Sequence, residues 1–458
     1  MYRRILLGPT NESILDYISS LEEDKLIVCE VLEVLEAHVN ELKDSNSIPP
    51  HVANEIISEI RILKSDPSPL FSTSSEDVHE SIELYMRNKL GDKAGYLALG
   101  RSRNDHVAAA LRLKLSRLVL EELRVLISLR RSLLSMAKNY LDTLIPLYTH
   151  FYPAQLSTLA HYLLYIDEML STYVEAILKV LELTFKSPLG SGPVAGVMTP
   201  INRERLASIL FGGKLVYNTL YASSSRDFML LLLAINASLM TSISRIVEDL
   251  ILLSTPYIGF FILPSEHLST SSIMPHKRNP VTLEVARAKA GEAIGNFVVV
   301  ASILKGLPSG YNLDLQEANI YAIRALSDTI NTLNMLNDII AKLRVNTEAM
   351  ARDIYTYPIL APDIVELVAL KTGRPFRIIY EEIAILIGEC RDTREFYTKV
   401  SEKYGISIEP LNFIERPVSG SPSISSTIKY IEESEGSLGV LELKLESINA
   451  MLPRGCYK

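Results

Sequence analysis

The stretch YPAQLSTLAHYLLYIDEMLSTYVEAILKVLELTFK, residues 152–186, carries apolar side chains at the spacing of an α-helix. Leu159, Leu163 and Leu170 belong to a wide apolar stripe that recurs every three or four residues. Proline, which breaks helix interiors, is absent between Pro153 and Pro188. The stretch therefore predicts one long helix that is too apolar to lie free in water.

The same pattern of apolar periodicity without proline recurs along the middle of the chain. It predicts five long helices, at about 104–141, 152–186, 224–255, 280–305 and 315–345. Each exceeds the usual length of about 11–12 residues, and convincing β alternation is scarce. The fold class is therefore all-α, with a central bundle of five long helices. Their surplus apolar surface favours association of several copies into a closed symmetric oligomer.

The segments on either side of this bundle have a different sequence pattern. Shorter helical patterns alternate there with turns rich in serine and proline, such as SNSIPP at 45–50 and RPVSGSPSISS at 416–426. We therefore expect three domains: an N-terminal helical domain at 1–101, a central bundle at 102–354 and a small C-terminal helical domain at 355–458.

Composition excludes several classes of protein. The 458 residues include 46 Lys plus Arg and 54 Asp plus Glu, giving a net charge of −8, so no bulk charge attracts nucleic acid or an anionic membrane. The uncharged run at 228–244 contains Asn236, serines and threonines and is short for a membrane span, which favours a core helix. The opening MYRRILLG has too few apolar residues for a signal peptide.

The three cysteines, Cys29, Cys390 and Cys456, are scattered and odd in number. They predict no disulfide framework and a location in a reducing cytoplasm. The eight histidines do not cluster at the spacings of metal ligands, so no metal is expected. The sequence has no HExxH, GxSxG or Walker A motif, and GSGPVAG at 190–196 imitates a phosphate loop only weakly.

Four polar segments interrupt the helical pattern and are candidates for chemistry. GRSRNDH at 100–106 precedes a long helix that Asn104 or Asp105 could cap, and its arginines suit an anionic ligand. YTHFYPAQ at 148–155 places His150 in a polar turn. The other two segments are SEHLSTSSIMPHKRNPVTLE at 265–284 and GLPSGYNLDLQE at 306–317.

The segment 265–284 is the most specific of the four. Its hydroxyl side chains are followed by Lys277, Arg278 and Asn279. Pro280 can start the next helix, with Asn279 as its cap. A hydroxyl-rich loop that ends on a helix N-terminus is suited to be a mobile lid over an anionic substrate.

Together these segments resemble the fumarase/aspartase superfamily, and within it the argininosuccinate lyases. SSIMPHKRNP at 271–280 is similar to the superfamily signature Gly-Ser-Ser-x-Met-Pro-x-Lys-x-Asn-Pro. Four further stretches resemble the argininosuccinate lyases: GRSRND at 100–105, EDVH at 76–79, Thr149-His150 and YNLDLQE at 311–317. The resemblance runs from about Ser20 to the segment 373–376 and so covers nearly the whole chain.

The resemblance implies a homotetramer with a core of twenty helices, and active sites that are each built from three subunits. It also implies cofactor-free cleavage of a small-molecule substrate, argininosuccinate, to arginine and fumarate. The residues that match the family's catalytic positions are Ser271, His150, Glu284 and Lys277. Those that match or adjoin its substrate-binding positions are Ser20, Asp24, Arg103, Asn104, Thr149, Ser272, Asn279, Tyr311 and Gln316.

These residue types suit a β-elimination. The reaction removes a weakly acidic proton next to a carboxylate, and negative charge grows there; Lys277 and Asn279 could stabilise that charge. Ser271 and His150 would be the acid and base, in either order, because one sequence does not decide between them. Glu284 would orient and charge His150.

The chain also departs from the family's pattern. Ala98-Leu99 stands where His-Thr is usual, and Tyr152, Thr270 and Asn319 replace a Gln, a Gly and a substrate-contacting Lys. The wording MPHKRNP is closer to adenylosuccinate lyase, which is the alternative enzyme. A crystallin-like structural protein without activity is the alternative outside enzymes.

Overall fold

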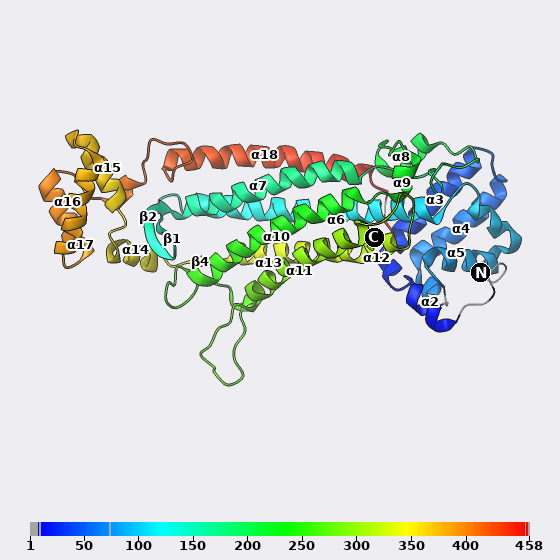
Figure 1. Ribbon diagram of the computed structural model, residues 1–458, viewed down its shortest axis with the longest axis horizontal. Coiled ribbons are helices and arrows are strands. Elements are labelled where there is room, and N and C mark those ends of the chain that lie inside the picture. Colours follow the sequence, from blue (N-terminus) through cyan, green and yellow to red (C-terminus); the bar gives the residue numbers. More distant parts are fainter. Residues whose placement is uncertain (1–7, 9–10, 73–74, 454, 457–458) are drawn as a thin grey trace.

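The computed structural model of the chain describes residues 8, 11–72, 75–453 and 455–456. A bundle of long helices forms the middle of an elongated molecule (Figure 1). Its helices are α6 (Arg103–Asn139), α7 (Leu159–Thr184), α10 (Asp227–Leu253), α11 (Val281–Leu304) and α13 (Asn319–Lys342). Helix α6 packs against α7 and α13, and α10 packs against α11. The predicted all-α class and the five long helices are confirmed.

One predicted helix begins later than expected. Residues 152–158 form strand β2 (Tyr152–Thr158), which pairs with β1 (Leu144–Thr149) in an antiparallel hairpin. Helix α7 starts only after Thr158, whose hydroxyl caps it by accepting from the backbone N–H of His161. The interpretation of 152–158 as helix was wrong, because the polar and proline-containing start of this stretch forms a ladder with the residues before it.

The predicted helix at 315–345 is also divided. It comprises α12 (Asp314–Glu317) and α13, and residues after it form β4 (Arg344–Val345), which pairs with β3 (Phe261–Ile262). Short helices α8 (Arg203–Phe211) and α9 (Thr219–Ser224) connect α7 to α10.

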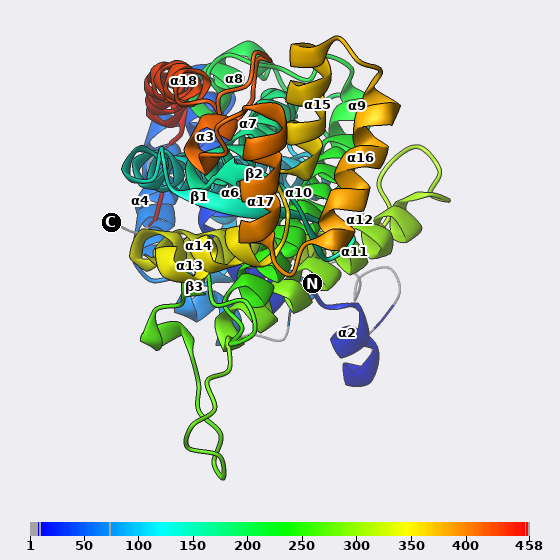
Figure 2. The same cartoon turned by 90° about the vertical axis from the view of Figure 1, so that its left-hand side faces the viewer.

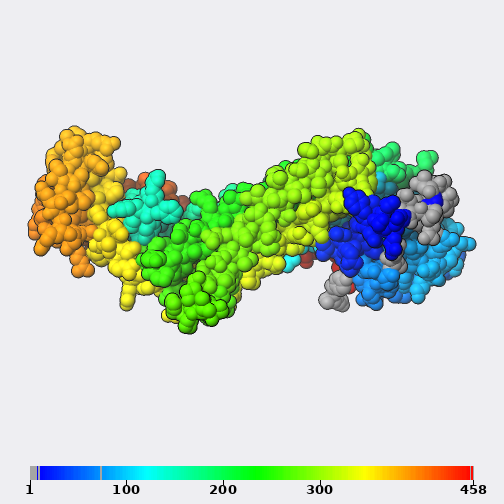
Figure 3. All heavy atoms as spheres, turned by 60° about the horizontal axis from the view of Figure 1, so that its bottom comes forward, coloured from blue at the N-terminus to red at the C-terminus, as the bar shows by residue number. Residues whose placement is uncertain are grey.

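The N-terminal elements gather at one end of the bundle (Figures 1 and 3). They are α2 (Glu12–Ile18), η1 (Glu23–Leu26), α3 (Val28–Asp44), α4 (Pro50–Ser65), η2 (Ser68–Ser72), α5 (Val78–Leu90) and η3 (Gly91–Ala98). Helix α3 packs against both α4 and α6, so the main hydrophobic core continues from the bundle into this end.

A second hydrophobic core lies at the opposite end. It is built on α14 (Thr347–Thr356), α15 (Ala361–Thr372), α16 (Phe376–Glu389), α17 (Thr393–Tyr404) and η5 (Pro410–Phe413). Ile364, Ile379 and Val400 are fully buried in it. The expected domain boundaries at 101/102 and 354/355 stay a prediction, because the last helix of the chain does not remain at this end.

That last helix, α18 (Ile424–Met451), runs back along α6 and α7 (Figure 1). Buried Arg130 on α6 pairs with Asp167 on α7 at 2.8 Å, and the hydroxyl of Ser434 on α18 donates to the same carboxylate at 2.8 Å. The chain then reaches α3, where Cys456 forms a disulfide with Cys29. The expectation of no disulfide was wrong because folding joins cysteines 427 residues apart, and the argument for a reducing cytoplasm loses its support.

Helix α10 is, among the described residues, the one helix long and apolar enough to cross a membrane. Half of its most apolar window is buried inside this single chain, where it packs against α7, α11 and α13. Apolar residues of α10 and α11 remain exposed, including Leu231 at 47%, Val285 at 57% and Val298 at 52%. This pattern is typical of a core helix with a second face that one chain leaves uncovered.

Candidate active site

A partly buried chain of hydrogen bonds joins the start of the protein to the segment after α11. The hydroxyl of Tyr311 donates to the side-chain carbonyl of Gln316 at 2.7 Å. The amide of Gln316 donates to the hydroxyl of Ser20, which donates to Asp24 at 3.1 Å. Folding thus brings together four predicted substrate-binding residues that lie nearly 300 positions apart in the sequence. We refer to Ser20, Asp24, Tyr311 and Gln316 as the buried cluster.

Asp24 is the only carboxyl group of the buried cluster. Burial raises the pKa of its side chain to about 7, and the nearby charge of Asp77 acts in the same direction. A hydrogen bond from the backbone N–H of Val78, at 3.0 Å, and the one from Ser20 oppose this rise. Near neutral pH the group is therefore poised between its two forms, and a cationic ligand would favour the carboxylate.

The segment GRSRND lies beside this cluster at the start of α6. Ser102 caps the helix and forms a capping box with Asp105, so the expectation that Asn104 or Asp105 is the cap was wrong. Arg103 pairs with Asp77 at 2.9 Å, while Asn104 donates to the backbone carbonyl of Pro193 at 3.2 Å. The N-terminus of a 37-residue helix is therefore presented next to the buried cluster.

The glycine-rich segment 190–196 serves this helix start. The N–H of Gly192 donates to buried Asp105 at 3.0 Å. Gly192 has φ +57°, and a Cβ there would lie 2.8 Å from the carbonyl oxygen of Gly196. The glycine is required for this turn, which explains the segment without a nucleotide.

Two histidines in the recognised motifs belong to the scaffold. His79 and His106 are buried with His38, and their rings meet edge to face, with centroids 4.9 Å apart for His38–His106 and 6.5 Å for His79–His106. Burial lowers the pKa of all three, reinforced by the charge of Arg101. They are neutral packing groups at pH 7.

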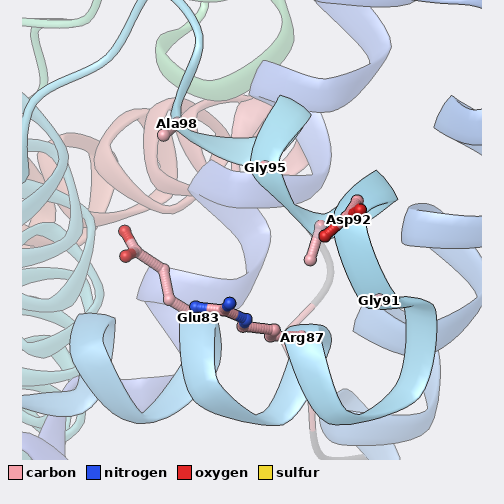
Figure 4. A pocket seen from close by; sticks show the side chains of 7 residues that line it. Glu83, Arg87, Gly91, Asp92, Gly95 and Ala98 are labelled. Atoms are coloured by element: carbon pink, nitrogen blue, oxygen red, sulfur yellow. The ribbon is translucent and has the colours of Figure 1, made fainter.

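A small hollow lies in the same region (Figure 4). Its volume is about 160 Å³, and its lining includes Glu83 and Arg87 of α5, Asp92 of η3 and Ala98. Glu83 also pairs with Arg101 at 2.7 Å. Ala98, one of the departures from the family pattern, therefore faces this hollow, whose lining includes no residue of the buried cluster.

His150 lies at the other end of the bundle, at the tip of the β1–β2 hairpin. His150 and Phe151 form the two-residue turn with φ +52° and +60°, a conformation that residues other than glycine rarely adopt. Such strain is typical of functional positions. A cavity of about 630 Å³ reaches His150 and is also lined by Tyr162 and Asp249. Thr149 is exposed at the end of β1.

The third group lies on the segment between Ser269 and Asn279, which projects from the bundle (Figures 1 and 2). The hydroxyl of Ser271 accepts from the N–H groups of Ile273 and Met274 at 3.3 and 3.2 Å. Ser272 and Lys277 are exposed. The next helix begins at Val281 without a side-chain cap, so the expectation that Asn279 caps it was wrong: its amide is directed toward Ser269.

Within one chain the buried cluster lies far from both His150 and Ser271, and no hydrogen bond or ion pair among the described residues joins those two. Asn104 stands at the start of α6 and the His150 hairpin follows its end; a helix of 37 residues is about 55 Å long. Ser271 precedes α11 and Tyr311 follows it, and 24 helical residues span about 36 Å. Glu284, exposed in the first turn of α11, has no contact with His150 among the described residues' hydrogen bonds and ion pairs.

Sequence reasoning missed one residue beside the buried cluster. Arg226, just before α10, is fully buried, and its Nε and Nη2 find no hydrogen-bond partner among the described residues. Burial lowers its pKa to about 10, and Tyr311 opposes the shift. An arginine at the start of the uncharged run 228–244 was the available signal. Asn319, the departure from lysine, is also buried, with its Oδ1 unpaired among these residues.

The described residues offer no metal centre: no group of three or more His, Cys, Asp or Glu side chains could hold an ion. The candidate site consists instead of hydrogen-bond donors and buried carboxyl groups at one end of the bundle, with the imidazole of His150 and the hydroxyl of Ser271 away from them.

Known proteins match this chain over almost its full length. It is 46% identical over 448 residues to the argininosuccinate lyase of Pyrococcus furiosus, covering 98% of this chain and 97% of that protein. It is 40% identical to that of Sulfolobus acidocaldarius, covering 96% and 93%. A family model described as "Lyase" matches residues 10–295. The chain belongs to the argininosuccinate lyase family.

Solved structures confirm the fold of this family member. An EDDS lyase in complex with formate superposes with a TM-score of 0.82 at 23% identity, covering 96% of this chain and 91% of that one. The class II fumarase of Schistosoma mansoni gives 0.64 at 16% identity, covering 84% and 90%. The lyase family and the fumarase/aspartase-like helical fold predicted from the sequence are both confirmed.

Proposed function

We propose that this lyase cleaves argininosuccinate into arginine and fumarate, the last step of arginine synthesis, at sites shared between the subunits of a homotetramer. The observation that carries the proposal is the separation of its three polar groups along the bundle. Each group matches the family's motifs, yet helices of about 55 and 36 Å keep the buried cluster apart from His150 and from Ser271 in one chain. Copies packed antiparallel would bring the groups of different chains together.

The uncovered helix faces support such packing. Val285 and Val298 of α11 are more than half exposed, and exposed apolar surface that is continuous marks an interaction site. Closed symmetric assembly buries such faces and creates composite sites at the ends of the shared core.

The buried cluster suits the arginine portion of the substrate. Asp24 would bind the cationic group, and Tyr311 and Gln316 would orient it through their hydrogen bonds. Asn104, Arg103 and Thr149 would bind the succinyl portion, together with Ser272 and Asn279 of the projecting segment. The charge of Arg103 is already shared with Asp77, so Arg103 acts mainly as an orienting group.

The chemistry is an elimination with two proton transfers. A base removes a proton from the succinyl carbon next to the carboxylate, the bond between the neighbouring carbon and the guanidine nitrogen breaks, and an acid protonates that nitrogen. Ser271 and His150 divide these two transfers. Glu284 of another chain would orient His150 and raise its basicity.

Charge stabilisation falls to the base of the projecting segment. Lys277 and Asn279 stand just before the N-terminus of α11, which adds a positive dipole. A positioned donor of this kind lowers a barrier by about 3–4 kcal/mol. The same positive charge favours an ionised Ser271, whose hydroxyl is otherwise a poor base.

Two substrates test the proposal. The purified protein is incubated separately with argininosuccinate and adenylosuccinate, and the release of fumarate is measured by its ultraviolet absorbance. Argininosuccinate should yield fumarate, and adenylosuccinate should yield little. Release from adenylosuccinate alone would support the purine enzyme instead. No release from either substrate would favour the structural, crystallin-like alternative.

A further inference from the structure

The projecting segment has a root that the sequence motifs do not describe. Ser269 and Asn279 form an isolated antiparallel bridge, with N–H to carbonyl distances of 3.0 and 2.8 Å. Everything between them, including Ser271 and Lys277, is a loop of mostly exposed residues. The position of the reactive hydroxyl therefore depends on what holds this bridge.

One side chain contacts both flanks of the bridge. His267 lies in η4 (Ser265–His267), two residues before Ser269, and is buried. Its Nδ1 lies 3.2 Å from the hydroxyl of Thr282, in the first turn of α11 beyond the far end of the loop. Its Nε2 lies 2.8 Å from the carboxylate of Asp338 on α13. The ring thus ties the beginning of the loop to its end, and both to the bundle.

The chemistry of the partners fixes the direction of one of these bonds. A carboxylate only accepts, so Nε2 donates to Asp338. Nδ1 shares the other hydrogen bond with the hydroxyl of Thr282, which can donate or accept. No smaller side chain offers a donor and an acceptor at opposite edges of a rigid ring.

A second link exists at the surface but is weaker. Lys342 pairs with Asp338 at 2.8 Å and with Glu266 at 2.9 Å, which closes a loop of contacts around His267. The side chains of Lys342 and Glu266 are 48% and 52% exposed. Solvent-exposed ion pairs contribute little to stability, so the buried imidazole carries most of the attachment.

We propose that His267 is a positioning residue that clamps the two ends of the Ser269–Asn279 segment and thereby aims Ser271 at the substrate. The inference rests on the proposed role of Ser271 in proton transfer. His267 does not touch the substrate; it acts through the bridge and through the first turn of α11, which also carries Glu284. Loss of the clamp leaves Ser271 present but misplaced, which costs turnover more than binding.

The test uses the full-length protein with His267→Ala, which removes both contacts, and His267→Gln, which can keep one. Hydrogen–deuterium exchange in peptides spanning 268–280 measures the bridge directly. We expect exchange there to accelerate about tenfold in His267→Ala, with less acceleration in His267→Gln and with the bundle helices unchanged. The kcat should fall by about tenfold and KM should stay within about twofold. Lys342→Met, which removes only the surface link, is the matched control and should change either value less than about twofold.

The outcomes separate the two ideas. Unchanged exchange at 268–280 in both His267 variants would overturn the clamp, whatever the activity. Faster exchange throughout the bundle would also overturn it, by showing a general stabilising role. Faster exchange confined to 268–280 with unchanged kcat would keep the clamp but reject the role of Ser271. A wild-type protein that releases no fumarate would reject the proposed function and leave the exchange test valid.

Discussion

The two ends of the bundle differ in how complete they are within one chain. At the N-terminal end, the buried cluster is fully assembled: Ser20, Tyr311 and Gln316 are already hydrogen-bonded around Asp24. At the other end, His150 occupies an exposed and strained turn. Among the residues that the structure describes, the hydrogen bonds of Ser271 stay within its own projecting segment.

This difference separates binding from chemistry. The groups that would recognise the arginine portion are rigid before any partner arrives, so their ordering cost is already met by folding. The groups that would move protons are left without fixed geometry. On the proposed function a single chain can bind the arginine portion but cannot turn over the substrate, and assembly supplies the catalytic geometry.

The largest expected effect comes from removing the hydroxyl of Ser271, at the end of the bundle opposite the buried cluster. Ser271→Ala should lower kcat by about a hundredfold or more, the scale of a positioned acid or base. Arginine binding, measured by calorimetry, should stay within about twofold, because the buried cluster is untouched. A variant that keeps its turnover would reject the role of the projecting segment.

Mixing two inactive variants sharpens the comparison. Ser271→Ala and His150→Asn are each defective, and subunits exchanged between them at equal amounts should recover about a quarter of native turnover if each site takes the two groups from different chains. If one chain supplied both groups, no recovery would follow. Subunit exchange is confirmed by native mass spectrometry with one variant carrying a heavy label, so an absence of recovery would count against shared sites.

A smaller effect is expected from Asp24 at the buried end. Its pKa of about 7 means that it is largely protonated at pH 6, and a neutral carboxyl attracts the substrate's cation poorly. The kcat/KM of the wild type should therefore fall by up to about tenfold per pH unit below pH 7. Asp24→Asn should lose this slope, while Asp16→Asn, on exposed α2, should retain it.

Lowering the pH below 7 should have opposite effects on activity and on stability: kcat/KM falls, while the contribution of Asp24 to the free energy of unfolding rises. The same variants test this. The folded pKa of Asp24 is raised above the model-peptide value of 3.8, so the folded state holds more protons between pH about 4 and 7. Its contribution to stability is present below pH 4 and is lost as the pH rises through 7. Urea unfolding should show Asp24→Asn gaining relative to the wild type across that window; a constant difference would contradict the raised pKa.

Periodicity predicted the long helices because each must bury a continuous stripe, and a 37-residue helix such as α6 leaves many residues to define it. Local chemistry was less reliable. The hairpin at 144–158 replaced a helical start, and Ser102 capped α6 in place of Asn104. Such choices depend on one or two hydrogen bonds, which tertiary contacts decide.

The sequence pointed to candidate site residues that lie in a recognisable motif, such as SSIMPHKRNP. It did not point to residues whose contacts exist only in the folded chain. Arg226 is buried near Tyr311, and His267 is buried beside Asp338. The spacing of these residues in the sequence does not reveal either contact. The pairing of Cys29 with Cys456 is the extreme case, because the two lie 427 residues apart.

The smallest effect on turnover, but a measurable one on stability, is expected from that disulfide. It fastens the end of the chain to α3, beside the region where Arg117 donates to the carbonyl of Pro453 at 3.0 Å. Both contacts lie at the end of the bundle that holds the buried cluster, so they should leave His150 and Ser271 at the other end unaffected. Cys456→Ser should therefore keep kcat within about twofold while lowering the free energy of unfolding by about 2–4 kcal/mol, chiefly by freeing the unfolded chain.

Reductant provides the internal control for this prediction. It should lower the denaturation midpoint of the wild type and of Cys390→Ser, whose free cysteine takes no part in the bond, but not that of Cys456→Ser. Equal sensitivity of all three proteins would show that the bond does not stabilise the fold. A large loss of kcat in Cys456→Ser would contradict the division between the two ends, because the end with the buried cluster would then affect chemistry as well as binding.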